Sequence, residues 1–219
     1  MIDNMMNELK RSVLSYGSFV KDMLLKSIEG ISKRDSKLLE NILNDLEPYA
    51  NIKELEIDEF CISSIAQLQP KGKQLRQIIM ALKINNDLER IADHAVNISE
   101  AAIELFKYPA SSIDEKIFSM ANQAISMFDD VLASFSYEDP EKAMAVCESD
   151  NQIDELNKNI IISFISKPVN SIEEKSTSLS LVLIARNLER IADLATNIAE
   201  DVYYIATGKV LKHHALEDK

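Results

Sequence analysis

The sequence is poor in the residues that build tight turns and sheets. Its 219 residues include four Gly, five Pro and no Trp, whereas 46% are hydrophobic and 27% are charged. Strand connections need glycine and proline, while long amphipathic helices need very few of either. We therefore predict an all-α fold.

Cysteines and long apolar runs are also scarce. Cys61 and Cys147 stand apart on apolar stretches, with no cluster of metal-ligand residues around either one, so we expect two reduced core thiols. The longest apolar run, Leu181–Ala185, is far too short to cross a bilayer, and Met1–Val20 has no continuous apolar signal segment. We expect a cytoplasmic protein without direct membrane insertion.

The chain has no excess of positive charge. The formal net charge is -12 at pH 7, and Lys and Arg dominate no stretch of the sequence. Nucleic-acid phosphates and anionic lipids attract basic proteins, so neither is expected as the main partner. Cations and basic protein surfaces suit this charge better.

An internal repeat is present. The segment Leu88–Glu100 recurs one hundred residues later as Leu188–Glu200, with ten of thirteen positions identical. A duplication at this offset predicts two similar units, at residues 1–109 and 110–219. Amphipathic stripes and helix-stop residues predict three helices in each unit, and their ranges are 4–29, 50–69, 72–107, 112–136, 140–166 and 171–207. Because Pro48 interrupts the second helix, residues 35–47 are expected to form a short piece of their own.

Paired carboxylates mark each unit. Acidic residues four apart project from the same helix face, and this spacing occurs four times. The pairs are Glu54 with Asp58, Glu89 with Asp93, Asp150 with Asp154, and Glu189 with Asp193. Two such charges about 4 Å apart repel by roughly 4 kcal/mol at an effective dielectric near 20, whereas a bound cation makes the pair favourable. Oxygen-only ligands select hard ions such as Mg²⁺, Ca²⁺, Mn²⁺ or ferric iron rather than structural zinc.

Three further residues extend these rows and are additional candidate ligands, namely Asn97, Asn197 and Asp201. Arg90 and Arg190 are expected to form local ion pairs with Asp93 and Asp193 rather than to bind a substrate. His94 points about 100° away from Asp93, which favours a polar surface or packing role over metal contact.

A solvated helix face is the alternative interpretation of the acids. Glu189 and Asp193 lie nearly opposite the apolar stripe that contains Ile191, Ala195 and Ile198, where charged residues often meet only water. A solvated face tolerates almost any polar residue, whereas here Glu, Arg, Asp and Asn recur together in register. The repeat therefore favours ion binding.

The repeated Leu-Glu-Arg-Ile-Ala-Asp followed by Asn-Ile resembles the signature of the PhoU family of phosphate-signalling proteins. Gln69-Pro70, Ala81-Leu82-Lys83-Ile84 and the ending Ile205-Ala-Thr-Gly208 are similar to that family too, so the likeness covers essentially the whole chain. The resemblance implies two three-helix bundles that bind metal ions, such as Fe, Mn or Mg, through the four acidic pairs.

The same resemblance implies a role and partners. Members of the family act as negative regulators of the phosphate-starvation response, the Pho regulon, and couple a phosphate ABC transporter to a PhoR-type sensor histidine kinase. The family is not known as a class of enzymes. A homodimer is left open by the sequence.

Two other functions remain as alternatives. A metal-dependent hydrolase or oxidase could use the carboxylates as a multinuclear centre, and a purely structural helical scaffold would need no metal at all. No nucleophile or phosphate-binding glycine loop supports an enzyme, because Gly72-Lys73 lacks the preceding glycine of a P-loop.

Overall fold

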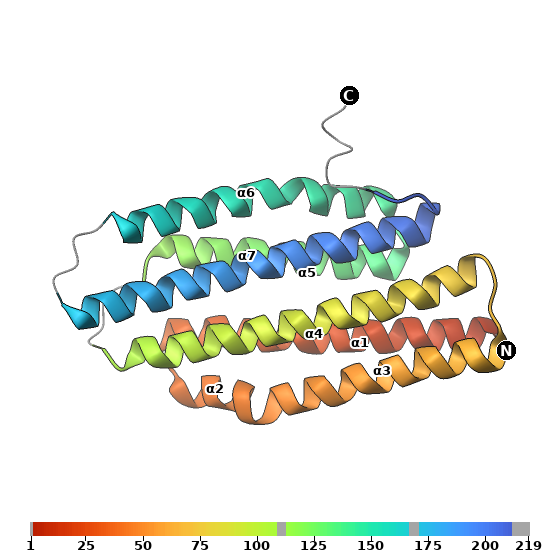
Figure 1. Ribbon diagram of the computed structural model, residues 1–219, viewed down its shortest axis with the longest axis horizontal. Coiled ribbons are helices and arrows are strands. Elements are labelled where there is room, and N and C mark those ends of the chain that lie inside the picture. The colour runs from red at the N-terminus through yellow and green to blue at the C-terminus, as the bar shows by residue number, and fades with distance from the viewer. Residues whose placement is uncertain (1, 109–112, 167–170, 212–219) are drawn as a thin grey trace.

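Each predicted helix is present within a few residues of its predicted bounds. The computed structural model describes residues 2–108, 113–166 and 171–211, and these fold into helices with no strand among them (Figure 1). The elements are α1 (Ile2–Lys33), α2 (Ser36–Asn41), the π-helical turn η1 (Ile42–Leu46), α3 (Glu47–Leu68), α4 (Lys73–Phe106), α5 (Glu115–Tyr137), α6 (Pro140–Ile165) and α7 (Ile172–Thr207). The predicted unit boundary between residues 109 and 110 lies outside the described residues.

Local sequence signals set where the helices begin and end. The Asp139 carboxylate accepts hydrogen bonds from the backbone N–H groups of Glu141 and Lys142, and Pro140 occupies the first turn of α6. The Ser171 side chain caps α7 in the same way. Gly208 ends α7 with a φ of 71°, a conformation that is cheap only for glycine.

The residues before Pro48 form a short helical piece of their own, as predicted. Asp35 caps α2, which runs through the wide turn of η1 into α3, and Pro48 lies in the first turn of α3. Proline has no N–H for the carbonyl one turn earlier and its ring crowds that carbonyl. The π-helical turn lies immediately before this point and accommodates the mismatch.

Two three-helix bundles pack side by side. Helices α1, α3 and α4 pack on one another in the first unit, and α5, α6 and α7 do so in the second (Figure 1). The predicted stripe of α1, which includes Leu9, Val13 and Val20, is at most 2% exposed. The stripe of α5 is also buried. The prediction of two tandem bundles is therefore confirmed.

Helices α4 and α7 join the units at a seam. Three contacts fix their register: the Arg76 guanidinium donates to the Ile205 carbonyl at 3.3 Å, Lys83 donates to Asp201, and His94 Nδ1 lies 2.8 Å from Asn187 Oδ1. Position along α4 increases as position along α7 decreases, so the two helices are antiparallel. Each unit therefore presents the same helix to the other.

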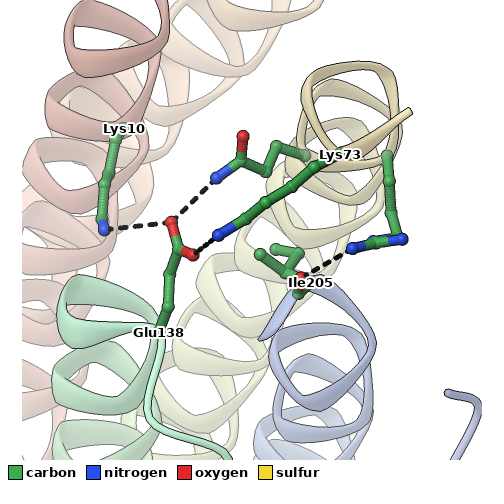
Figure 2. Close-up of polar contacts among 6 residues, drawn as sticks. Lys10, Lys73, Glu138 and Ile205 are labelled. Atoms are coloured by element: carbon green, nitrogen blue, oxygen red, sulfur yellow. Dashed lines mark hydrogen bonds and ion pairs between the residues drawn. The ribbon is translucent and has the colours of Figure 1, made fainter. Parts of the chain in front are cut away.

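A polar cluster at one end of the seam joins the units a second time. Glu138, just after α5, accepts hydrogen bonds from Lys73 at 2.7 Å and from Gln77 at 2.8 Å, and Lys10 lies 3.6 Å away (Figure 2). Lys10 belongs to α1, and Lys73 and Gln77 belong to α4. One carboxylate of the second unit thus binds two helices of the first.

Candidate metal centre

Three carboxylates converge between α6 and α7. Asp150 and Asp154 lie one turn apart on α6, and Asp193 faces them from α7. One carboxylate oxygen from each lies within 4.8 Å of the other two. Within the described ranges no other trio of His, Cys, Asp or Glu side chains comes so close. We call these three residues the aspartate triad.

The triad is half-buried, which makes its negative charge costly. Asp150 and Asp193 are partly buried and Asp154 is exposed. Two of these charges repel by roughly 3 kcal/mol at an effective dielectric near 20. Glu189 is a further acidic side chain near the triad. Burial raises the pKa of its carboxyl, and the charges of Asp193 and Asp154 raise it further. A cation between the two helices would remove this repulsion.

An unpaired oxygen lies on the same face of α6. Asn157 follows Asp154 by three residues, and its side-chain carbonyl oxygen is buried without a hydrogen-bond donor. A buried acceptor without a donor costs free energy unless a donor or a cation satisfies it. Three carboxylates are the kind of donor set that hard ions prefer, so the aspartate triad fits such an ion. Sequence reasoning missed Asn157, although its spacing from Asp150 and Asp154 places it on their face.

The acids of the first unit share a looser patch. Asn85 donates one hydrogen bond to Asp58 Oδ1 and one to the Glu54 carbonyl, both at 2.9 Å. Burial raises the pKa of Glu89, and the charges of Asp93 and Glu54 raise it further. The four predicted acids are therefore neighbours, but they do not meet as closely as the aspartate triad.

The first patch includes residues that the sequence did not predict as ligands. Glu47 joins it from the start of α3, since burial raises the pKa of this carboxyl and Asp93 raises it further. Burial also raises the pKa of Tyr16, with Glu89 and Glu54 adding to the shift. The Tyr16 hydroxyl and the Asn85 carbonyl oxygen are buried without a hydrogen-bond partner. Tyr16 also belongs to the buried stripe of α1 that contains Leu9, Val13 and Val20, so its spacing in the sequence indicates only a core residue.

The remaining candidate ligands differ in their surroundings. Asn97 and Asn197 are exposed and extend their rows. Asp201 is buried and its carboxylate is bound by Lys83 of α4. Its position on α7, two turns beyond Asp193, places it at the seam rather than in the aspartate triad.

One of the two expected arginine ion pairs is wrong. Arg190 binds Asp193 at 3.0 Å as predicted, but Arg90 binds Asp87 at 3.1 Å instead of Asp93. Asp87 is buried on the seam side of α4, where an unpaired charge would be costly. Burial raises the pKa of the Asp87 carboxyl, and the charge and hydrogen bond of Arg90 partly offset that shift.

The remaining predictions for single residues can be placed as well. Cys61 and Cys147 are buried free thiols, as expected. His94 is half-buried and bonds Asn187 across the seam, which agrees with the expected packing role. No helix of the described residues is long and apolar enough to span a bilayer.

Comparisons with known proteins agree over nearly the whole chain. Residues 13–102 and 117–202 each match the family model of the PhoU domain. A phosphate-specific transport system accessory protein PhoU homolog of Thermotoga maritima is 30% identical and aligns with 97% of this chain and 90% of its own length. One from Clostridium acetobutylicum is also 30% identical, with 93% of each chain covered.

Solved structures are similar too. The crystal structure of the phosphate transport system regulatory protein PhoU from Streptococcus pneumoniae has a TM-score of 0.89 and 27% identity. The match covers 97% of this chain and the whole of the Streptococcus pneumoniae chain. The crystal structure of PhoU from Pseudomonas aeruginosa has a TM-score of 0.90 at the same identity, and 95% of this chain covers all of it.

Proposed function

This chain belongs to the PhoU family, and from that premise we propose that it is a cytoplasmic accessory protein that negatively regulates phosphate uptake and phosphate-starvation signalling. The proposal is supported by both PhoU-domain matches and by full-length relatives whose names describe accessory proteins of a phosphate-specific transport system. The single observation that carries it is the repeated acidic motif, present in both units and converging as the aspartate triad in the second.

Within this role we propose that the acidic rows bind hard metal ions. Asp150, Asp154 and Asp193 would hold one ion with the help of the Asn157 oxygen, and Glu54, Asp58, Glu89 and Asp93 would hold another. Such an ion would supply positive charge to a surface that otherwise repels itself. Mn²⁺, Mg²⁺ and ferric iron all suit an oxygen-only set.

Elemental analysis tests the metal proposal. The full chain, purified without chelator or affinity metal, is expected to retain manganese or iron, and the Asp150→Asn/Asp154→Asn variant is expected to lose the ion of the second unit. The matched control is Glu148→Gln/Glu155→Gln, which removes two exposed charges from the same helix outside the triad. Metal-free wild-type protein that also fails to take up Mn²⁺, Mg²⁺ and ferric iron would contradict the proposal.

Gene deletion tests the regulatory role. We expect cells that lack the gene to produce alkaline phosphatase in phosphate-rich medium, where intact cells repress it. Complementation with the triad variant separates regulation through metal from a purely structural scaffold, because a scaffold would restore repression with either variant. Unchanged repression in the deletion strain would overturn the regulatory proposal itself.

We propose that the partners are a phosphate ABC transporter and a PhoR-type sensor histidine kinase. The net charge of -12 favours basic docking surfaces on either partner. Co-elution of the purified chain with the cytoplasmic part of each partner, at low and at high salt, is the direct measurement. Catalytic turnover is not part of the proposal, and sustained hydrolysis of phosphate esters that is lost in Asp193→Ala would argue for an enzyme instead.

A further inference from the structure

The outward face of α3 carries large apolar side chains in contact with solvent. Ile52, Leu55 and Ile62 are 54%, 64% and 56% exposed. Their spacing places them on one face of the helix, opposite the buried residues Ile57 and Cys61. Helix α3 packs on α1, α4 and η1, and it lies on the side of the first unit that is away from the second (Figure 1). We call Ile52, Leu55 and Ile62 the outer stripe.

The second unit shows how this face looks when it only meets water. When the acidic pairs of α3 and α6 are aligned, the three positions of the outer stripe correspond to Glu148, Asn151 and Lys158. All three are polar and exposed. Within the described part of α6, Ile162 is the one large apolar side chain that is exposed, and it stands alone. Single exposed apolar residues are ordinary, whereas a row of three on one face indicates a surface that something covers.

A cavity of about 580 Å³ adjoins the outer stripe between α1 and α3. Tyr49 lines it, is 46% exposed and lies one turn before Ile52. The Tyr49 ring is 4.8 Å from the ring of Phe19 on α1, measured between centroids, and Phe60 forms a further wall. The charged residues of the lining are balanced in sign and are Glu8, Arg11, Lys53 and Glu56. Aromatic walls around such a cavity suit one large apolar side chain of a partner.

The spacing of the outer stripe suits a second helix. Positions 52, 55, 59 and 62 alternate by three and four residues, which is the pattern that a neighbouring helix covers in a coiled coil. Glu59 is the one polar residue in this row, and within the described residues it has no ion-pair partner. Glu56 lies beside it and binds Lys53 at 2.6 Å. Since a carboxylate buried without a partner is costly, the covering helix needs a cation opposite Glu59.

Charge decides what kind of helix fits. Helix α3 contains five acidic residues and one basic residue. A second copy of α3 on the outer stripe would bring two acidic helices together, and it would place an apolar side chain or another glutamate against Glu59. An anionic membrane surface would repel the same acids. A helix with lysine or arginine beside its apolar residues matches both features of the face.

We propose that the outer stripe is a docking surface for a basic amphipathic helix of another protein. The apolar side chains of that helix cover Ile52, Leu55 and Ile62, one of them enters the cavity beside Tyr49, and a lysine or arginine pairs with Glu59. None of these residues belongs to the acidic pairs or to the aspartate triad. The surface therefore depends neither on metal nor on the phosphate-signalling role, and its failure would leave both proposals standing.

Fluorescence anisotropy of the full chain with a synthetic helical peptide tests the proposal. The peptide has about 18 residues, with leucines at alternating spacings of three and four and lysines beside them. We expect one peptide to bind per chain, and the affinity to fall on the order of 10-fold or more in Leu55→Ser/Ile62→Ser, because apolar burial is lost. Glu59→Lys should weaken binding as well. The matched control is Leu179→Ser/Leu183→Ser, which removes two exposed leucines of α7 and should leave the affinity unchanged.

A charge-reversed peptide, with glutamate in place of each lysine, completes the test and should bind on the order of 10-fold or more weakly. Equal binding of the two peptides, no binding of either, or equal losses in the two serine variants would overturn the proposal. Sedimentation equilibrium and vesicles of phosphatidylglycerol test the other occupants. A wild-type dimer, or vesicle binding, that is lost in Leu55→Ser/Ile62→Ser would assign the face to a second copy or to a membrane and would also overturn it. Thermal unfolding verifies that each variant is folded.

Discussion

At the scale of single residues, burial decides the chemistry of this protein more than charge does. Asp201 is an example, since burial raises the pKa of its carboxyl and Lys83 only partly offsets the shift. Ionising Asp201 therefore lowers the free energy of unfolding. This loss grows as pH rises from the ordinary carboxyl range toward neutrality. Lys83 limits that cost.

Replacing Lys83 with methionine should expose the full cost. We expect Lys83→Met to lower the free energy of unfolding by about 1–3 kcal/mol at pH 7, because a buried carboxylate loses its partner. Below about pH 4 the loss should shrink, since Asp201 is then protonated in both states. Urea denaturation at the two pH values measures this difference. Lys21→Met, which breaks the more exposed pair with Asp129, should cost less than about 1 kcal/mol at either pH.

The two thiols should be chemically inert in the folded protein. Burial raises the pKa of Cys61 and of Cys147 to about 12, with nearby carboxylates adding to the shift. Only the thiolate reacts with alkylating reagents, so we expect alkylation at pH 8 to be on the order of a thousandfold slower than for an unfolded thiol. Mass spectrometry after timed iodoacetamide treatment, with and without urea, checks this. Fast labelling in native buffer would show that the helices around the thiols open readily.

At the scale of elements, helix packing tolerates little additional volume at two glycines of α1. A Cβ at Gly30 would lie 2.5 Å from Cδ2 and 2.8 Å from Cγ of Leu39, which is fully buried. At Gly17 the close contact is confined to a terminal methyl group of Leu132, which is only partly buried. The two positions therefore differ in how easily the neighbour can move.

We expect Gly30→Ala to destabilise the protein by about 1–3 kcal/mol through overpacking against α2, beyond the roughly 1 kcal/mol that alanine gains in a helix. Gly17→Ala should be closer to neutral, because the Leu132 methyl group can rotate away. Thermal unfolding of both variants makes the comparison. Equal melting temperatures for the two would show that Leu39 relaxes as easily as Leu132.

Sequence alone was enough for the helices but not for the way their acids meet. Caps such as Ser171 and Gly208 and the stripe of α1 are local signals, so the helix bounds were predicted closely. The spacing of Asp150 and Asp154 predicted a shared face, because that spacing depends on one helix only. Convergence with Asp193 depends on how α6 packs on α7, and no local pattern contains that register.

The missed and mistaken residues have the same origin. Asn157 and Asn85 take part through buried amide groups whose surroundings come from a neighbouring helix. Arg90 was paired with Asp93 on spacing alone, whereas Asp87 has the same spacing in the other direction and is more deeply buried. The repeated motif shows which acidic residues recur. It does not show which of them is buried by a neighbouring helix.

At the scale of the whole molecule, the two units are held as one body by contacts along the seam and at its end. Glu138 is the clearest case (Figure 2). Burial alone would raise the pKa of its carboxyl, but the bonds from Lys73 and the charge of Lys10 lower it overall. A lowered pKa means that the stabilisation is present above the ordinary carboxyl range and is lost as pH falls through the folded-state pKa.

Glu138→Gln should therefore cost about 1–2 kcal/mol at pH 7 and less at about pH 2, because the wild-type carboxyl takes up a proton as pH falls through its lowered folded-state pKa. Glutamine keeps the left-handed backbone at this position, so the comparison isolates the charge. Guanidinium denaturation at both pH values measures it, and hydrogen exchange in α5 should increase in the variant at pH 7. A loss that does not change with pH would show that shape rather than charge holds this end together.

The antiparallel pairing of α4 with α7 has a consequence for the order in which the two units can follow one another along the chain. Met6 near the start of α1 and Ile205 near the end of α7 line the same small cavity, so the two ends of the described chain lie at one end of the molecule. A circular permutant that joins these ends through a short flexible linker and opens between the units would exchange the order of the halves and keep every contact between them. Because the halves meet through equivalent helices, such a rearranged chain should fold to the same architecture.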